Sequence, residues 1–121
     1  MFYVICPPRR TDWHFDRELL IERLIADWPG VQIGGPEAAL SSRDVVWSYS
    51  SDAGVLEGSQ DRAGRAHYLD GPVSLVARYA AWWRGQVPPD QPLMLCDDGY
   101  NVRVNLDPDV TPERISEQLQ G

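Results

Sequence analysis

The segment of residues 72–85 constrains the fold of this chain more than any other, because it predicts a helix that is apolar around most of its circumference. Arg78 and Arg84 are its only charged residues. Adjacent residues on a helix point about 100° apart, so Trp82 and Trp83 cannot both face the same neighbour. One tryptophan should pack on a sheet, and the other needs a second element, a partner subunit or solvent.

Hydrophobic periodicity and turn residues predict three helices and seven strands. The expected helices cover residues 16–28, 72–85 and 112–119, with Asp16 and Thr111 as N-caps and Pro72 at the first helical position. The expected strands cover residues 2–6, 31–33, 45–50, 54–60, 65–69, 93–97 and 100–106. This order, β-α-β-β-β-β-α-β-β-α, predicts a single α+β domain over residues 1–121. We expect a mostly antiparallel β-sheet with two main helices packed on one face and a short, peripheral C-terminal helix.

Two pairs of predicted strands carry turn signals typical of β-hairpins. Residues 61–64, which end in glycine, join the strands 54–60 and 65–69, and Asp98-Gly99 joins the last two strands. Because the strands 54–60 and 65–69 are polar, we expect this hairpin either at an edge of the sheet or on a surface used for contact.

The charge of the chain limits its partners. It carries 11 basic and 18 acidic residues, a net charge of −7, and every basic residue is an arginine. Sequence-independent binding to phosphate backbones requires a basic surface, so this balance argues against nucleic acid. Net acidity permits a basic protein partner, because complementary fields speed the encounter of two proteins.

Location and cysteine chemistry follow from the same sequence. No apolar run approaches the roughly 20 residues that span a bilayer, so no membrane partner is expected. No secretory signal is evident, which predicts a cytoplasmic protein with two reduced, buried cysteines. Cys6 and Cys96 fall in different predicted strands and could form a disulfide only if those strands were suitably placed neighbours.

No catalytic motif is recognisable in the chain. His14 and His67 are the only histidines, and no nucleophile elbow or other local signature accompanies either. Gly34-Gly35 lacks the further residues of a phosphate-binding loop, and two isolated cysteines do not make a zinc pattern. We therefore expect a protein that is not an enzyme and has no cofactor.

Carboxylates around the last predicted hairpin are candidates for a metal site. Such a group could hold calcium or magnesium, but its spacing differs from that of an EF-hand loop. Turn formation explains these residues better, so no metal ligand is assigned. The residues are Asp97, Asp98, Asp107 and Asp109.

Acidic residues, Asp52 and Asp70 among them, also gather in or beside the polar hairpins, close to tyrosines expected at the surface. Carboxylates around aromatic anchors suit docking to a basic protein, although a solvated acidic face has the same composition. The candidate partner-binding residues are Glu57, Asp61, Tyr68, Asp97, Asp98 and Tyr100.

The second half of the chain resembles a class of small bacterial proteins, some of which are similar to the immunity partners of polymorphic or contact-dependent toxins. The pattern is an apolar helix ending Ala81-Trp82-Trp83-Arg84, then Val87-Pro88, the run from Gln91 to Tyr100, a strand, and Thr111-Pro112-Glu113-Arg114-Ile115. The resemblance covers about residues 66–116. It implies a small acidic α+β protein that binds and blocks a cognate toxin, and it transfers no functional residue.

These observations leave three hypotheses for function. The leading one is a non-enzymatic protein-binding protein, an immunity-type inhibitor of a bacterial toxin. The first alternative is a small enzyme or small-molecule binder with a pocket between the 72–85 helix and the sheet, lined by His67, Asp97 or Tyr100. The second alternative is a homodimer formed through the apolar helix.

Overall fold

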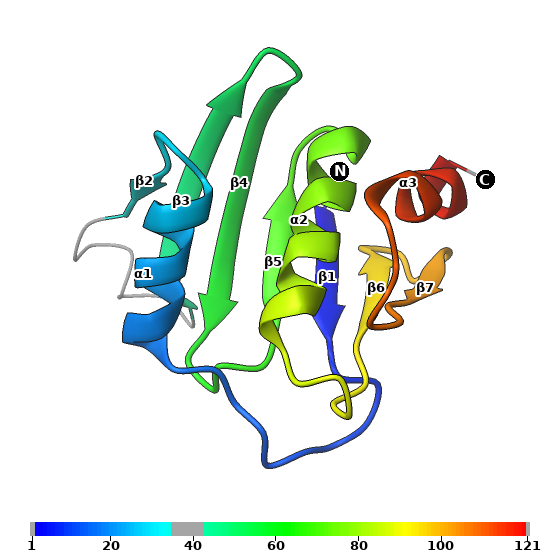
Figure 1. Ribbon diagram of the computed structural model, residues 1–121. Coiled ribbons are helices and arrows are strands. Elements are labelled where there is room, and N and C mark those ends of the chain that lie inside the picture. Colours follow the sequence, from blue (N-terminus) through cyan, green and yellow to red (C-terminus); the bar gives the residue numbers. More distant parts are fainter. Residues whose placement is uncertain (1, 35–42, 121) are drawn as a thin grey trace.

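The computed structural model describes residues 2–34 and 43–120 (Figure 1). Within them, seven strands form one antiparallel sheet in the order β2-β3-β4-β5-β1-β6-β7. The strands are β1 (Phe2–Cys6), β2 (Gln32–Ile33), β3 (Arg43–Ser51), β4 (Gly54–Asp61), β5 (His67–Asp70), β6 (Met94–Asp97) and β7 (Arg103–Asn105). The helices are α1 (Arg17–Asp27), α2 (Val73–Gln86) and α3 (Pro112–Gln120). The α+β class, the antiparallel sheet and the order of elements predicted from the sequence are confirmed.

Two predicted boundaries need correction. The last strand is expected over residues 100–106, but β7 begins only at Arg103, because Asp97 holds the residues before it in a turn. Pro72 takes the N-cap position of α2 rather than the first helical position, with an extended ψ of 146°. Of the predicted Gly34-Gly35 break, Gly35 lies outside the described residues.

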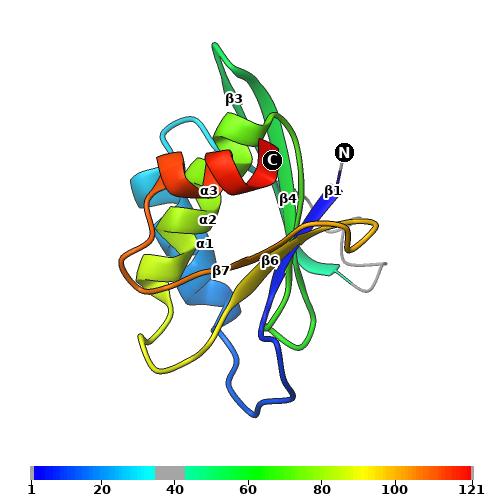
Figure 2. The same ribbon diagram turned by 90° about the vertical axis from the view of Figure 1, so that its right-hand side faces the viewer.

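The strand register sorts side chains onto two faces of the sheet. Trp83 of α2 stacks on His67 of β5, and Trp28, which follows α1, contacts Tyr49 of β3. Both contacted residues belong to one set of alternating strand residues: Tyr3, Ile5, Val45, Trp47, Tyr49, Leu56, Gln60, His67, Leu69, Leu95 and Val104. Among the described residues, Figure 2 shows no helix against the opposite face of the sheet.

His67 lies at the centre of the aromatic core. Its ring is fully buried and stacks on Trp83, with ring centroids 3.9 Å apart. The Tyr79 hydroxyl donates to Nδ1 at 2.9 Å, and Nε2–H donates to Oε1 of Gln60 at 2.9 Å. Burial lowers the pKa of His67 to about 3, so the ring is neutral at pH 7. This hydrogen-bonded chain ties α2 to β4 and β5.

Trp82 finds its second element in α1. Its Nε1 donates to Oδ2 of Asp27 at 2.8 Å, and its ring meets Trp28 edge-on with centroids 5.9 Å apart. Arg78 lies over the Trp28 ring, with the guanidinium carbon 4.6 Å from the centroid. The two adjacent tryptophans therefore face different elements, as their helical spacing predicts: Trp83 packs on the sheet and Trp82 on α1.

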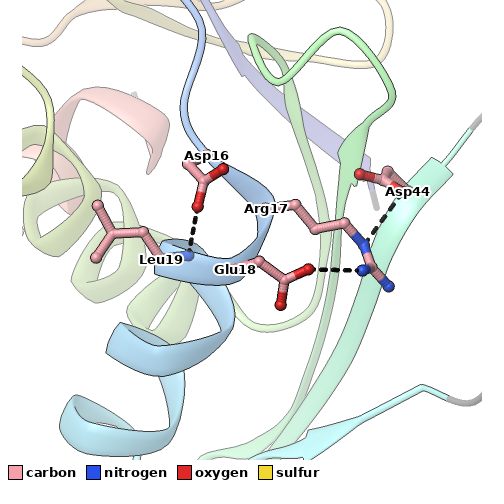
Figure 3. Close-up of polar contacts among 5 residues, drawn as sticks. All are labelled: Asp16, Arg17, Glu18, Leu19 and Asp44. Carbon is pink, nitrogen blue, oxygen red and sulfur yellow. Dashed lines mark hydrogen bonds and ion pairs between the residues drawn. The ribbon is translucent and has the colours of Figure 1, made fainter.

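The N-terminus of α1 is held by polar contacts (Figure 3). Asp16 is the N-cap, as predicted, and its Oδ2 accepts the backbone N–H of Leu19 at 3.0 Å. Nε of Arg17 lies 3.3 Å from Oδ1 of Asp44 on β3, and its Nη1 lies 3.2 Å from Oε1 of Glu18. These contacts connect the start of α1 to β3.

One expectation about the placement of elements is wrong, and one of the two alternatives for another is excluded. The C-terminal helix is not peripheral, because Ile115 is fully buried and α3 packs against α2 and β7. The β4–β5 hairpin does not lie at an edge, because β5 is the central strand of the seven. Its polar residues lie on both faces: Gln60 and His67 are buried as a hydrogen-bonded pair, while the next pair in the register, Ser59 and Tyr68, faces the other way.

Arg84 fixes the segment that follows α2. Its Nη1 donates to the carbonyl of Gln91 at 2.8 Å, and its Nη2 donates to those of Pro88 at 2.5 Å and Val87 at 3.3 Å. Burial lowers the pKa of Arg84, so the charged guanidinium needs these acceptors. The contacts set the path of the chain from α2 into β6.

Gly58 of β4 should tolerate no side chain. It pairs with Trp47 of β3, whose indole ring occupies the space that a Cβ at residue 58 would need. We expect Gly58→Ala to lower the free energy of unfolding by about 1–3 kcal/mol, as overpacking of a filled core does. Gly85→Ala is the control, because nothing lies within 4 Å of its added Cβ. In urea denaturation the free energy of unfolding of this control should rise by up to about 1 kcal/mol. A decrease equal to that of Gly58→Ala would contradict the close contact between residue 58 and Trp47.

The pH dependence of stability should report the burial of His67. Its pKa is about 3 in the folded chain, against a reference value of 6.5, so the unfolded state binds the extra proton between these values. The stability conferred by the neutral ring is therefore complete above pH 6.5 and is lost as the pH falls toward 3. We expect the free energy of unfolding from urea denaturation to fall by about 1 kcal/mol from pH 7 to pH 5.5.

Variants at the two histidines identify the group responsible for this pH dependence. His67→Gln should flatten the dependence between pH 7 and pH 5.5, whereas His14→Asn, at an exposed position, should keep it. The opposite result for the two variants would show that the core histidine is not the titrating group.

Candidate partner-binding groove

The helix-free face of the sheet carries two rows of side chains that the register defines. Directly opposed residues on neighbouring antiparallel strands have Cβ atoms about 5 Å apart, so each row forms a continuous surface. The first row is Ser48, Glu57, Asp70 and Phe2, on β3, β4, β5 and β1. The second row is Val46, Ser59, Tyr68 and Val4, on the same strands.

A groove of about 470 Å³ lies over these rows. Its lining combines apolar and aromatic side chains with three carboxylates, of which Glu57 on β4 and Asp98 after β6 are exposed, and Asp70 on β5 is half-buried. Phe2 and Tyr100 are 57% and 71% exposed, which makes them two of the large hydrophobic side chains that the fold leaves in solvent. No basic residue is among the described residues that line the groove: Phe2, Val4, Val46, Glu57, Gly58, Ser59, Tyr68, Leu69, Asp70, Asp98 and Tyr100.

The β6–β7 turn brings Asp98 and Tyr100 to this groove. Oδ1 of Asp97 accepts the backbone N–H groups of Asn101 at 2.7 Å and Val102 at 3.2 Å, and its carbonyl accepts the N–H of Tyr100 at 3.1 Å. Tyr100 has a φ of 56°, in the left-handed region where a bulky side chain is strained. The predicted hairpin is present, but its left-handed residue is the one after the glycine of the Asp98-Gly99 signal.

Four of the six predicted partner-binding residues come together in the groove: Glu57, Tyr68, Asp98 and Tyr100. The other two lie outside its lining and hold turns. Oδ1 of Asp61 accepts the backbone N–H groups of Arg65 at 2.9 Å and Ala66 at 3.1 Å, which closes the β4–β5 turn. Asp97 does the same for the β6–β7 turn and is only 9% exposed. These two carboxylates shape loops and present little surface to a partner.

Sequence reasoning missed Phe2 and Val4 in this groove. The strand β1 is apolar on both faces, with Tyr3 and Ile5 toward the helices and Phe2 and Val4 away from them. A strand that is apolar at every position in a sheet covered on one side must expose apolar surface on the other. That signal is visible in residues 2–6, but it has meaning only once β1 is known to be central and one face uncovered.

Buried aromatic side chains lie between α2 and the sheet. Trp47, Tyr79 and Trp83 are all buried there around His67. The residues expected to line a pocket at this place are not brought together, because Tyr100 lies on the opposite face. The apolar helix is covered within the chain by α1 and α3.

Cys6 and Cys96 lie on neighbouring strands, and both are free thiols. The register pairs Cys6 with Met94 and Cys96 with Val4, so the two cysteines are diagonal neighbours. Diagonal residues lie about 7–8 Å apart, too far for a disulfide without a shift of the backbone. Burial raises the pKa of both thiols, which keeps them protonated and poorly nucleophilic at neutral pH.

Other kinds of site find little support in the part of the chain that the structure describes. No three His, Cys, Asp or Glu side chains gather there in a way that could hold a metal ion. None of the described helices combines the length and the apolar character needed to cross a membrane. No protein-family model, curated protein or solved structure matches the chain.

Substitutions at Tyr100 should separate the backbone of the turn from its side chain. Glycine adopts a positive φ without steric strain, so Tyr100→Gly should raise the free energy of unfolding by about 1 kcal/mol. Tyr100→Ala removes the same ring but keeps the Cβ, so its free energy of unfolding should rise much less. Urea denaturation measures both variants, and equal stabilities would show that the left-handed backbone at residue 100 is not strained.

Proposed function

We propose that this chain is a non-enzymatic protein-binding protein whose helix-free sheet face receives a basic partner. The groove carries the proposal: it combines the exposed rings of Phe2 and Tyr100 with the carboxylates of Glu57 and Asp98. Desolvated aromatic anchors supply much of the affinity of protein interfaces, and complementary charges supply fast and selective association. The net charge of −7 attracts a basic partner over longer distances.

The proposal takes the two main helices, α1 and α2, to pack on one face of the sheet, so that the other face is free for a partner. The contacts of Trp28 with Tyr49 and of Trp83 with His67 support this arrangement, because both strand residues belong to the same face. A partner then meets strands that the aromatic core holds rigid. Rigid surfaces lose little conformational entropy on binding.

The partner we propose is a bacterial toxin domain, which makes the chain an immunity-type inhibitor acting in the cytoplasm. The resemblance of residues 66–116 to such proteins supports this assignment. A toxin with a basic active-site rim would lie against the acidic groove, and its anionic substrate would be excluded. Inhibition of this kind requires no catalytic residue in the chain itself.

A charge-reversal pair tests the proposal. The tagged full chain is used to capture its partner from cells of the organism that encodes it, and the recovered protein is then purified for titration. We expect Glu57→Lys/Asp98→Lys to weaken binding to that protein by about tenfold or more, because two of the three carboxylates that line the groove become cationic and repel a basic partner. The same variant should fail to protect cells that express the partner.

The matched control is Glu22→Lys/Glu117→Lys. It changes the net charge by the same amount at exposed positions on α1 and α3. This control should bind and protect like the wild-type chain. Equal binding by the two double variants would place the interface elsewhere, and a dimeric mass in solution that the groove variant abolishes would replace the foreign partner by a second copy of this chain.

A further inference from the structure

We infer that the groove takes up an arginine side chain of the partner, with its guanidinium between the rings of Phe2 and Tyr100 and paired with Asp98. The inference rests on the proposed function and specifies the chemistry of its contact. Three residues from two distant parts of the chain form this subsite, and all three line the groove.

The register brings these residues together. Tyr3 pairs with Asp97 on the neighbouring strands β1 and β6. The register ends at this pair, and the next residue along each chain segment, Phe2 and Asp98, lines the groove. Tyr100 stands two residues later in the turn that Asp97 holds, with its ring largely in solvent. The subsite therefore combines two exposed aromatic rings with one exposed carboxylate.

This combination favours a cation. The face of an aromatic ring carries negative charge density, so it attracts the same ligands as a carboxylate. The helix layer already uses this chemistry within the chain, where Arg78 lies over the rings of Trp28 and Tyr49 at 4.6 and 5.6 Å. In the described part of the chain, no arginine lies over Phe2 or Tyr100. These rings are left for a cation that another molecule supplies.

Arginine fits the subsite better than lysine. A guanidinium is planar, so it stacks on a ring while the N–H groups at its edge bind a carboxylate with two hydrogen bonds. It is also more weakly hydrated than an ammonium group, which lowers the free energy of burying it. Asp98, next to Phe2 and Tyr100, is placed to accept such a pair.

Two other carboxylates line the groove: Asp70, which pairs with Phe2 across β5 and β1, and Glu57, which lies too far away to share this arginine. Glu57 is on β4, separated from the extension of β6 by β5 and β1. Three strand spacings correspond to roughly 14 Å between the two backbones. Glu57 is therefore left for a second basic group of the partner, and it serves as an internal control for the Asp98 subsite.

The backbone conformation of Tyr100 supports a binding role for its ring. Its φ of 56° suits glycine better than tyrosine, so the side chain is held over the groove at the expense of strain in the turn. Asp97, which holds that turn, is a positioning residue for the ring.

Small-molecule probes test the subsite directly on the isotope-labelled full chain. N-acetyl-arginine methylamide is titrated and followed by NMR, in parallel with the citrulline analogue, which has the same shape without the charge, and the lysine analogue. We expect the arginine probe to shift resonances of Phe2, Asp98 and Tyr100. The citrulline probe should bind about tenfold more weakly than the arginine probe, because it cannot form charge-assisted hydrogen bonds. The affinity of the lysine probe should lie between those of the other two.

Three variants locate the binding. Asp98→Asn and Tyr100→Gly should each lower the affinity for the arginine probe by about fivefold or more. The loss at Tyr100→Gly would not come from instability, because this variant is expected to be more stable than the wild-type chain. Glu57→Gln should bind the arginine probe like the wild-type chain. The inference is overturned if citrulline binds as well as arginine, if the shifts spread over all surface carboxylates, or if Glu57→Gln weakens the probe as much as Asp98→Asn does.

The failure of this inference is distinguishable from failure of the proposed function. If the arginine probe does not bind but Glu57→Lys/Asp98→Lys still abolishes partner capture, the subsite is wrong and the groove remains the interface. If the probe binds but charge reversal leaves capture intact, the subsite stands and the proposed interface falls.

Discussion

The neutral ring of His67 joins the two layers of this fold, and the remaining structure depends on it. It accepts a hydrogen bond from Tyr79 of α2, donates one to Gln60 of β4, and stacks on Trp83. Both ring nitrogens of His67 are hydrogen-bonded, so the ring fixes the relative position of α2 and the sheet more specifically than hydrophobic packing alone would. Trp82 then bonds to Asp27, which brings α1 into the same layer. The rings of Trp28, Trp82 and Trp83 thus all have aromatic contacts within the chain.

The other face of the sheet differs in the exposure of its aromatic side chains. Aromatic rings in the helix layer find their partners inside the chain, including the Arg78 guanidinium over Trp28. Phe2 and Tyr100 have comparable chemistry but stay in solvent, next to exposed carboxylates. Surface of this kind lowers solubility unless a partner covers it, and a high net charge offsets that liability. The acidic, aromatic groove and the net charge of −7 both suit the basic partner that we propose.

The acidic residues fall into two physical roles that composition cannot separate. Asp61 and Asp97 each accept two backbone N–H groups and determine the shape of a turn. Glu57 and Asp98 are exposed in the groove lining and keep their charge available to a partner. The turn carboxylates act on the groove indirectly, because Asp97 decides where the ring of Tyr100 stands. The shape of the groove that we propose as a binding surface therefore depends partly on loop geometry.

The sequence by itself determined the order of the elements, the N-cap at Asp16 and the β4–β5 turn, because each follows from local periodicity or local hydrogen bonding. Helical periodicity also determined that Trp82 and Trp83 contact different elements. It also pointed to Glu57, Tyr68, Asp98 and Tyr100 through their polar surroundings. Only the tertiary structure decided that β5 and β1 are central, that Ile115 and His67 are core residues, and that Phe2 belongs beside Asp98. Strand pairing joins residues far apart in the chain, and which face a helix covers depends on the packing of all layers, so neither can be read from a local pattern.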